Sequence, residues 1–443
     1  MSKPFSIFSE RKRLQLTVLW FSICQSLGNT SNRVICCARI VHMQRKNKIR
    51  LTHFLRVAKR SDIWILLSIL LLAIGGILMI GSASMGLSIG DNFALMITVG
   101  KQAVFIILGY FMMCFASNHF RLHHLTSDKF IYLLLFMEAV LLACVGFEPA
   151  GGAYAWIRIR TPVAELTIQP SEFCKIVVVL MMAAYLGDSR RKKGGFWIMC
   201  RVPLIALGIY AGTIVFIQKD LGSAAVMILM CFAVFLIPKH RFLTAAQHGF
   251  TVLFLVCVGI VVFLISPAGM AFIEAMPLFT YQKNRFLSAI NPFMDQYGDG
   301  YQLINGLISF ATGGLFGVGF GKSIQKYTNF PAANTDFILA VLVEETGFVG
   351  FMFLMSLYCL LMGRLFYYAY KIRSEKAKMI LVGTAMYFLI HIFLNVGGVT
   401  GMIPLTGVPL PLMSAGGSSA MSMMLAVGIS QAVISQFQKG EIV

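Results

Sequence analysis

Long apolar runs alternate with short polar or basic segments along most of this chain. Because a helix needs about 20 apolar residues to cross a bilayer, each run predicts a membrane-spanning helix. We expect spans at 63–82, 94–116, 130–146, 173–187, 202–217, 221–237, 249–266, 337–363, 379–396 and 418–435. The two runs that meet at 218–222 are short, so the pattern allows eight to ten spans. The predicted fold class is all-α, a polytopic membrane protein with about ten transmembrane helices.

Three polar segments on one side of the predicted spans are long enough to carry a site. The largest, at about 266–335, lies between spans 7 and 8, and its stretches 278–288 and 301–310 have helical periodicity. We therefore expect a large, partly helical outer loop. The segment 148–170 comes earlier in the chain. The third segment, 397–419, contains three prolines, so this third segment cannot be a regular helix. Irregular backbone at membrane depth must lie against protein or a water-filled cavity.

Composition and charge place the chain in a membrane and give its orientation. Only 12% of the residues are charged and the mean hydropathy is +0.79, whereas soluble proteins carry roughly twice that charged fraction. The net charge of +19 could indicate nucleic-acid binding, but most of the 37 Lys and Arg residues fall on one side of the predicted spans. That asymmetry is typical of cytoplasmic segments. We therefore expect a cell-membrane protein with cytoplasmic N- and C-termini, long segments on the outer face, and no nucleic-acid partner.

Residues 1–60 form a separate basic region ahead of the first predicted span. Their apolar run 14–24 is too short to cross a bilayer. We interpret 1–60 as a cytoplasmic tail attracted to anionic lipid, and 61–443 as the transmembrane domain. Two alternatives stay open: the run is a signal-peptide core, or the start is mis-assigned and the native chain begins at Met43. The ten cysteines show no CxxC pair and no zinc spacing, which indicates small buried side chains.

Ionisable residues inside or at the edge of the spans are the main chemical signal. A charge in the bilayer costs several kcal/mol unless it is paired or hydrated, so each such residue is a candidate for function. They are Lys101, Glu138, Glu172, Lys175, Lys219, Asp220, Asp336, Glu344 and Glu345. All except Glu138 fall toward the outer half of the predicted spans. We therefore expect a polar site at the outer face.

Several of these candidates also have a structural explanation. Glu172 and Lys175 are three residues apart, a spacing that allows an ion pair on one helix face. The adjacent Lys219 and Asp220 suit pairing and capping at a helix start, and Asp336 suits an N-cap. These explanations compete with catalytic or ligand-binding roles for the same residues.

A series of short motifs is spread over residues 168–419. They are IQPSEF at 168–173 with Lys175, KDLGS at 219–223, Arg285 with NPF at 291–293, GYQ at 300–302, GGLFGVG at 313–319, SIQK at 323–326, TDF at 335–337, EE at 344–345, PLP at 409–411 and SAGGSS at 414–419. Through these motifs the chain resembles the SEDS family of bacterial cell-wall polymerases, which includes FtsW, RodA and SpoVE. The loop before Asp336 looks closer to FtsW than to RodA.

The resemblance implies a fold and an activity. SEDS proteins have ten spans with a large outer loop between spans 7 and 8. They join lipid II, a disaccharide-pentapeptide carried on undecaprenyl diphosphate, into glycan strands outside the membrane. We therefore expect a peptidoglycan glycosyltransferase that is FtsW-like and acts in cell division, with a RodA-type role in elongation as the alternative. The implied partners are a monofunctional class B penicillin-binding protein, which is a transpeptidase, and other division or elongation proteins.

The resemblance also places the family's essential aspartate on Asp336, which we expect to be the general base that takes a proton from the acceptor's 4-hydroxyl. The leaving diphosphate needs positive charge, for which the candidates are Lys175, Lys219, Arg285 and Lys326. A divalent cation, Mg²⁺ or Mn²⁺, could assist, held through Asp336 or the diphosphate; no organic cofactor is expected. Glu344 and Glu345 are expected to shape the cavity by pairing with Lys175 or Lys101. The predicted substrate-binding residues are Glu172, Lys175, Lys219, Asp220, Arg285, Gln302, Lys326, Glu344, Glu345 and Ser414.

Two other functions fit some of the same features. A transporter that flips the lipid-linked precursor would also have broken helices and intramembrane charges. It needs a polar path that opens to both faces, whereas the charges here lie toward the outer half. A non-catalytic scaffold would not depend on Asp336. The position of the charges favours the polymerase.

Overall fold

The computed structural model describes residues 56–87, 91–126, 130–147, 153–160, 165–188, 195–266, 268–269, 291–298, 300–328, 330 and 332–442. Internal contacts separate Met1–Arg56 from Val57–Val443, and all elements named below belong to the second unit. The predicted tail up to residue 55, the predicted helix at 278–288 and Arg285 lie outside the described residues. The predictions that concern them stay predictions.

Among the described residues, a helix covers each of the ten predicted spans. These helices are α3 (Ile63–Leu87), α4 (Asn92–His119), α5 (Phe130–Ala143), α6 (Pro170–Leu186), α7 (Gly195–Gly212), α8 (Leu221–Phe235), α9 (Arg241–Ile265), α13 (Ile338–Lys371), α14 (Glu375–Val399) and α15 (Gly417–Gln438). In a bilayer a helix satisfies its backbone hydrogen bonds within one segment, which is why long apolar runs fold in this way. Seven spans are long and apolar enough to cross a membrane, whereas α5, α6 and α8 are shorter. The prediction of an all-α, multi-pass membrane protein is confirmed.

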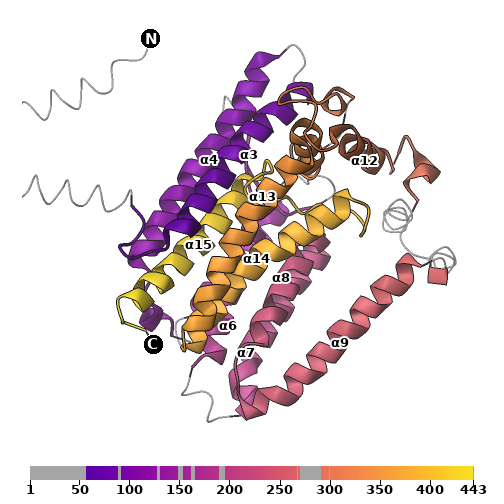
Figure 1. The fold of residues 1–443 in the computed structure, drawn as a ribbon. Helices are drawn as coiled ribbons and strands as arrows, with labels where there is room; N and C mark the ends of the chain where they lie inside the picture. The colour runs from indigo at the N-terminus through magenta and orange to yellow at the C-terminus, as the bar shows by residue number, and fades with distance from the viewer. Residues whose placement is uncertain are drawn as a thin grey trace, which may run out of the picture. The chain divides into compact units, whose positions relative to one another are not determined.

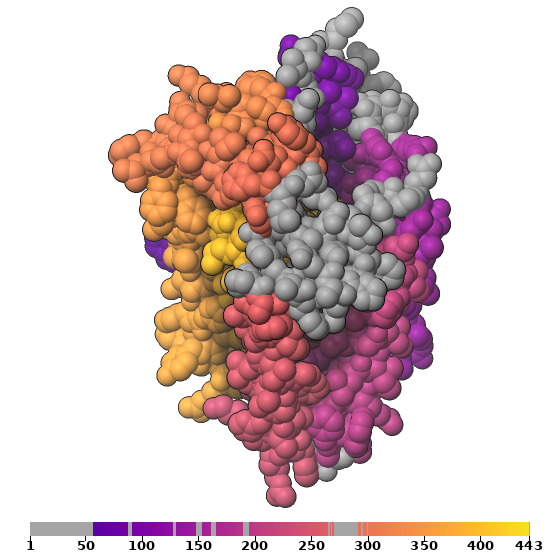
Figure 2. Space-filling model, turned by 90° about the vertical axis from the view of Figure 1, so that its right-hand side faces the viewer, coloured from indigo at the N-terminus to yellow at the C-terminus, as the bar shows by residue number. Residues whose placement is uncertain are grey.

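The helix α15 lies inside the bundle, whereas α9 lies at its periphery. Of the membrane-crossing stretch of α15, 89% is buried, against 0% for α9. α15 packs against α4, α6 and α14, and α13 packs against α3 and α14, as Figure 1 shows. α9 contacts α7 (Figure 1), and Figure 2 shows α9 on the outside of the molecule. α15 and α14, whose membrane-crossing stretches are 89% and 72% buried, are therefore the innermost of the long spans.

The described part of the large outer segment contains two helical elements. α12 (Tyr301–Gly313) packs against α13, and the 3-10 turn η6 (Gln325–Tyr327) packs against α3. The Tyr301 hydroxyl donates a 2.5 Å hydrogen bond to the Thr328 carbonyl, which ties the two elements together. The prediction of a helix at 301–310 within this segment is confirmed.

A short β-hairpin precedes α6, where the sequence indicated a loop. Strands β1 (Ile157–Arg160) and β2 (Glu165–Ile168) are antiparallel, with Ile157 opposite Ile168 and Arg160 opposite Glu165. Arg158 forms a 3.5 Å ion pair with Glu165. The alternation of apolar and polar side chains in both strands is the period-2 pattern of a strand. β2 leads directly to the first turn of α6, where Pro170 suits a helix start.

Glycines allow α4 and α15 to pack backbone against backbone. A Cβ atom at Gly428 would lie 2.5 Å from the Met113 carbonyl oxygen, and one at Gly109 would lie 2.8 Å from the Met424 sulfur. Small residues permit this close approach where helices associate in a membrane. The contact seats α15 in the bundle.

A buried ion pair ties α3, α13 and α15 together at one end of the bundle. Asp62 Oδ2 accepts hydrogen bonds from the Arg364 guanidinium and from the Tyr368 hydroxyl, the latter at 3.0 Å. The Asp62 backbone exchanges two 2.8 Å hydrogen bonds with the Gln431 side chain. Burial raises the pKa of Asp62, but the Arg364 guanidinium, the Ile65 amide and Tyr368 together hold that pKa below its ordinary value.

Replacing Asp62 tests the contribution of this pair to stability. Asp62→Asn should lower the free energy of unfolding by about 1–3 kcal/mol at pH 7, because Arg364 loses its partner but is partly exposed. A lowered pKa in the folded state stabilises the protein above the unfolded pKa of about 3.9. That contribution is lost as the pH falls through the folded pKa of Asp62. The free energies of unfolding of the wild type and of Asp62→Asn should therefore converge below that pH.

The measurement is thermal unfolding of the purified protein in detergent, in steps from pH 7 to about pH 2, which passes below the unfolded pKa and through the lowered folded pKa. Arg121→Ala is the control, because its ion pair with Glu441 lies at the surface and such pairs contribute little. An equal destabilisation by Asp62→Asn over the whole of this pH range would contradict the assignment.

Candidate active site

Asp336 lies in a turn that leads into α13. Residues 332–337 form this turn, and the helix begins at Ile338 with Phe337 at the N-cap position and no capping side chain. The N-cap position belongs to Phe337, so the structure does not favour the alternative explanation of Asp336 as the N-cap. The turn presents Asp336 as a half-buried carboxylate ahead of the helix.

Three consecutive peptide carbonyls of this turn, those of residues 334–336, each accept a hydrogen bond from the opposite wall. The donors are, in order, Ala415 N at 2.9 Å, Ser414 Oγ at 2.6 Å and Asn395 Nδ2 at 2.9 Å. Since peptide groups away from water must be paired, these bonds determine where the turn can lie. They fix the backbone of Asp336 against α14 and the segment after it.

The irregular segment 400–416 forms the wall that faces Asp336. A Cβ atom at Gly407 (φ +69°) would lie 3.9 Å from Asp336 Oδ2. Asn395 Nδ2 also donates to the Val408 carbonyl at 2.9 Å, and Ser414 Oγ accepts from Leu410 N at 2.8 Å. The prediction of irregular backbone packed against protein is confirmed for this segment. Ser414 shapes the wall through its two hydrogen bonds.

The start of α8 contacts the same segment. Asp220 caps α8 by accepting from Ser223 N at 3.0 Å, as predicted, and it accepts from Gln169 Nε2 at 2.7 Å. A Cβ atom at Gly222 would lie 2.8 Å from the Thr406 carbonyl oxygen. The segment 400–416 therefore contacts both Asp336 and the start of α8 that Asp220 caps.

Lys219 stands next to this cap and is exposed. Its backbone is in the left-handed region, with φ at +59°, which is uncommon for a residue with a side chain. Its ammonium lies 5.9 Å from the centre of the Tyr154 ring. Lys219 is thus a cation at the surface near the Asp336 wall.

Glu172 and Lys175 form the predicted ion pair, deep in the bundle. Lys175 Nζ lies 2.7 Å from Glu172 Oε1, and both side chains are almost fully buried. The other carboxylate oxygen of Glu172 accepts a 2.5 Å hydrogen bond from Tyr387, whose hydroxyl lies 2.8 Å from Ser422 Oγ. A buried pair needs such additional hydrogen bonds to offset the cost of removing its charges from water.

A polar stripe on α14 connects this pair with the Asp336 turn. Tyr387, His391 and Asn395 are spaced four apart and so lie on one helix face. His391 Nδ1 donates to the Tyr387 carbonyl at 2.9 Å, and its Nε2 is buried without a partner among the described residues. Four residues of helix rise about 6 Å, so Tyr387 lies about 12 Å along α14 from Asn395. This stripe was not predicted from the sequence, although polar residues four apart in an apolar span are its signal.

A second buried cluster lies beside the turn and holds three of the predicted site residues. Lys326 Nζ donates to Glu345 Oε1 at 3.0 Å, to Ser82 Oγ at 3.0 Å and to the Gly321 carbonyl at 2.8 Å. Glu344 accepts from Ser323 Oγ at 2.5 Å and from two backbone amides.

The predicted pairing of Glu344 and Glu345 with Lys175 or Lys101 is wrong, because the outer segment supplies their partners. Lys326 uses all three N–H donors within the protein and is 0% exposed. It is therefore not placed to contact a diphosphate.

The remaining predicted residues are less informative. Gln302 is half-buried in the first turn of α12, and Arg285 lies outside the described residues. Within the described ranges, no group of three His, Cys, Asp or Glu side chains could hold a metal ion. Seven described cysteines are free and five of them are buried, as expected for small packing residues.

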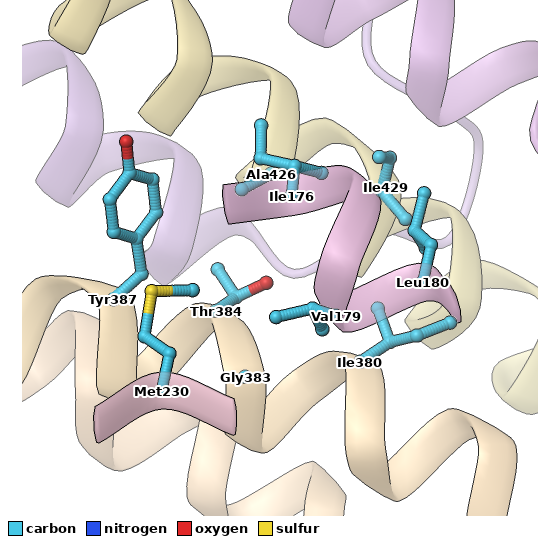
Figure 3. A pocket seen from close by; sticks show the side chains of 10 residues that line it. All are labelled: Ile176, Val179, Leu180, Met230, Ile380, Gly383, Thr384, Tyr387, Ala426 and Ile429. Atoms are coloured by element: carbon cyan, nitrogen blue, oxygen red, sulfur yellow. The ribbon is translucent and has the colours of Figure 1, made fainter. Parts of the chain in front are cut away.

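An apolar cavity lies between α6, α8, α14 and α15, and Tyr387 is one of the residues that line it (Figure 3). Val179, Met230 and Ile380 line it, with Thr384 and Tyr387 at its edge. Its volume is about 10 Å³, room for about one water molecule. The cavity is a packing defect and cannot admit a sugar.

Comparison with known proteins supports the sequence resemblance. Residues 62–439 match the family described as "Cell cycle protein", that of FtsW, RodA and SpoVE. The probable peptidoglycan glycosyltransferase FtsW of Bacillus subtilis is 32% identical over 395 residues, which cover 87% of this chain and 93% of the relative. The protein of the same name from Coxiella burnetii is 31% identical over 381 residues, covering 83% and 94%. The stage V sporulation protein E of Bacillus subtilis is 31% identical over 373 residues, covering 82% and 94%.

Solved structures share the fold. A chain of a peptidoglycan synthase complex that coordinates polymerization and crosslinking aligns with a TM-score of 0.64 and 24% identity, covering 85% of this chain and 98% of the other. The rod shape determining protein RodA of Thermus thermophilus aligns with a TM-score of 0.52 and 22% identity, covering 85% and 97%. The names of the curated relatives confirm the predicted enzyme class, a peptidoglycan glycosyltransferase. On the match over residues 62–439, the chain belongs to the FtsW, RodA and SpoVE family.

Proposed function

We propose that the protein polymerises lipid II into glycan strands at the outer face of the membrane, with Asp336 as the general base. The observation that carries this proposal is the Asp336 turn, a half-buried carboxylate whose backbone is fixed by hydrogen bonds to three consecutive carbonyls. Catalytic groups need such fixed positions, because small misplacements lower rates steeply.

In the proposed reaction, Asp336 accepts the proton of the acceptor's 4-hydroxyl as that oxygen attacks the anomeric carbon of the donor. The new glycosidic C–O bond forms while the bond from the anomeric carbon to the phosphate oxygen breaks. The diphosphate leaves with the bonding electron pair, and the proton remains on Asp336. A general base of this kind typically contributes about 10²–10⁴ in rate.

The leaving diphosphate needs a cation near the same wall. Lys219 suits this role best among the described candidates, because it is exposed and adjoins the Asp220 cap. Lys175 is paired with Glu172 and Lys326 is enclosed by protein. Arg285 stays a candidate from the sequence resemblance.

The charge distribution supports an outer active site with cytoplasmic termini. Basic residues gather around the end of α13 opposite Asp336, as Arg364 and Lys371 in α13 and Lys376 in α14 illustrate. Cytoplasmic ends of spans carry this excess of Lys and Arg. Asp336 precedes the other end of α13 and would therefore face outward.

The polymerase is better supported than a transporter. A lipid flippase needs a polar path that opens to both faces. The cavity between α6, α8, α14 and α15 is apolar and about 10 Å³ in volume, so it offers no polar path for a lipid-linked sugar. The other end of α13 is tied to α3 and α15 through Asp62. Polar groups therefore gather at the Asp336 end and along α14, which suits a site with one open face.

We further propose a class B penicillin-binding protein as partner, together with other division or elongation proteins. The structural neighbour from a peptidoglycan synthase complex supports such an assembly by analogy of fold. Polymerisation and crosslinking of one strand are coupled most simply when the two enzymes are held together.

Replacing Asp336 tests the proposed base. Asp336→Asn keeps the size of the side chain but cannot accept the proton, so the polymerisation rate should fall about 10²–10⁴-fold. The measurement is glycan strand formation from purified lipid II by the purified protein in detergent, normalised to folded protein.

Asp91→Asn is the matched control for this substitution. Asp91 caps α4 and is exposed, and Asn is as good an N-cap as Asp. Its activity should stay at the wild-type level. A folded Asp336→Asn protein that polymerises at the wild-type rate would exclude Asp336 as the base, and liposome translocation without product would favour the flippase.

A divalent cation is the one cofactor that we propose. Because the described residues contain no cluster of three metal-binding side chains, Asp336 and phosphate oxygens of the substrate would have to hold it. Carboxylate plus phosphate oxygens are ligands that Mg²⁺ prefers, and the cation would neutralise charge on the diphosphate. Chelation with EDTA should abolish polymerisation, and Mg²⁺ or Mn²⁺ should restore it. Full activity in EDTA would refute the requirement.

The cellular role can be separated from the chemistry. The 31–32% identity to FtsW relatives supports a division role, so a functional fluorescent fusion should concentrate at the septum. A uniform side-wall signal would instead favour a RodA-type role in elongation. Asp336→Asn in the same fusion should keep its location but lose complementation.

A further inference from the structure

The helix α13 is interrupted at Gly347, where φ is +71° and ψ is −171°. This conformation is available to glycine and strained for other residues. The break divides α13 into 338–346, which follows Asp336, and 348–371, which continues across the bundle. Peptide groups on both sides of a break lose their helical partners, and in an apolar environment each must find another.

The turn after α12 supplies those partners. Its amides donate to carbonyls before the break, and its carbonyls accept from amides after it. The four bonds are Val318 N to Glu344 O at 2.9 Å, Gly319 N to Glu345 O at 3.0 Å, Phe348 N to Gly314 O at 2.9 Å and Val349 N to Leu315 O at 3.1 Å. A Cβ atom at Gly317 (φ +77°) would lie 2.2 Å from the Glu345 carbonyl oxygen. Only a glycine allows this fit.

A buried ion pair between Lys326 and Glu345 lies next to this break in α13. Lys326 Nζ lies 3.0 Å from Glu345 Oε1, and both side chains are 0% exposed. Ser82 of α3 donates a 2.5 Å hydrogen bond to the same carboxylate oxygen and accepts one from Lys326. The pair is thus held to α3 as well as to α13.

The two partners are 19 positions apart in the sequence, and Asp336 lies midway between them. The ion pair therefore joins the two ends of the segment 326–345, and Asp336 lies near the middle of this segment. One arm of the segment is seated on α3, because a Cβ atom at Gly86 would lie 1.8 Å from the Lys326 carbonyl oxygen. Nearer the middle, Asn334 Nδ2 lies 3.3 Å from Ser84 Oγ.

We propose that Lys326 and Glu345 are positioning residues for Asp336: their ion pair sets the height and orientation of the turn that carries the base. This inference rests on the function proposed for Asp336. It assigns the two residues a role away from the substrate, since the protein encloses both side chains. The pair fixes the two ends of the segment 326–345. The hydrogen bonds from Asn395 and Ser414 fix the turn at its middle.

The test compares Lys326→Met and Glu345→Gln with the wild type. Both variants keep side-chain volume while removing one charge of the pair. The polymerisation kcat per folded enzyme should fall about 10²-fold in Lys326→Met, because a displacement of about 1 Å at a catalytic group can cost that much. KM for lipid II should change by less than about threefold, since neither residue contacts substrate. Amides of Phe348 and Val349 should exchange hydrogen faster in both variants.

The matched control is Asp62→Asn, which removes one charge of the ion pair at the other end of α13. It should lower thermal stability yet leave kcat per folded enzyme unchanged. A merely structural role for Lys326 and Glu345 would give the same result as this control.

The outcomes separate this inference from the proposed function. Wild-type kcat in folded Lys326→Met and Glu345→Gln, with Asp336→Asn inactive, would overturn the positioning role and leave the base intact. A raised KM with unchanged kcat would also overturn it, by indicating substrate contact. If Lys326→Met does not fold, the isosteric Glu345→Gln decides. Activity in Asp336→Asn would instead refute the proposed function itself.

Discussion

The four backbone hydrogen bonds around Gly347 are the constraint on which the outer half of the structure depends. An unpaired peptide group in an apolar environment costs several kcal/mol, so α13 can break there only because the turn after α12 completes its hydrogen bonding. The same contact brings Lys326 close to Glu345 and anchors the chain on both sides of Asp336. The position of the carboxylate therefore follows from how a broken helix satisfies its own backbone.

Buried ion pairs lie at three levels of the bundle, and the pairs or their hydrogen-bond partners connect neighbouring helices. Asp62, Glu172 and Glu345 are 4%, 2% and 1% exposed, and each is paired with a cation from Arg364, Lys175 or Lys326. Such pairs contribute little net stability compared with apolar packing, but losing one partner is costly. We interpret them as fixing which helices meet and at what depth. Asp336 differs from these three acids in being half-buried in a turn, which suits the catalytic role that we propose for it.

The parts predicted from the sequence are those governed by local geometry. The spans follow from apolar runs, the Glu172–Lys175 pair from a three-residue spacing, and the Asp220 cap from its place at a helix start. The partner of Glu345 could not be predicted, because it depends on the course of an irregular segment 19 residues away. Asn395 was not predicted as a site residue, because a single amide side chain in an apolar span shows no periodicity. The pattern appears only when Tyr387 and His391, on the same helix face, are considered with it. Asp336 resembled a cap in sequence, whereas backbone contacts hold its turn.

Close backbone contacts at Gly86, Gly317 and Gly428 have a consequence for evolution. At each position, the nearest atom to an added methyl group would be a peptide oxygen, at 1.8, 2.2 and 2.5 Å, and no rotamer change can move it aside. Neutral drift can exchange one lipid-facing side chain of α9 for another at small cost. The three glycines have no such freedom, so divergent homologues that keep this architecture should retain them even where the surrounding sequence has changed beyond recognition.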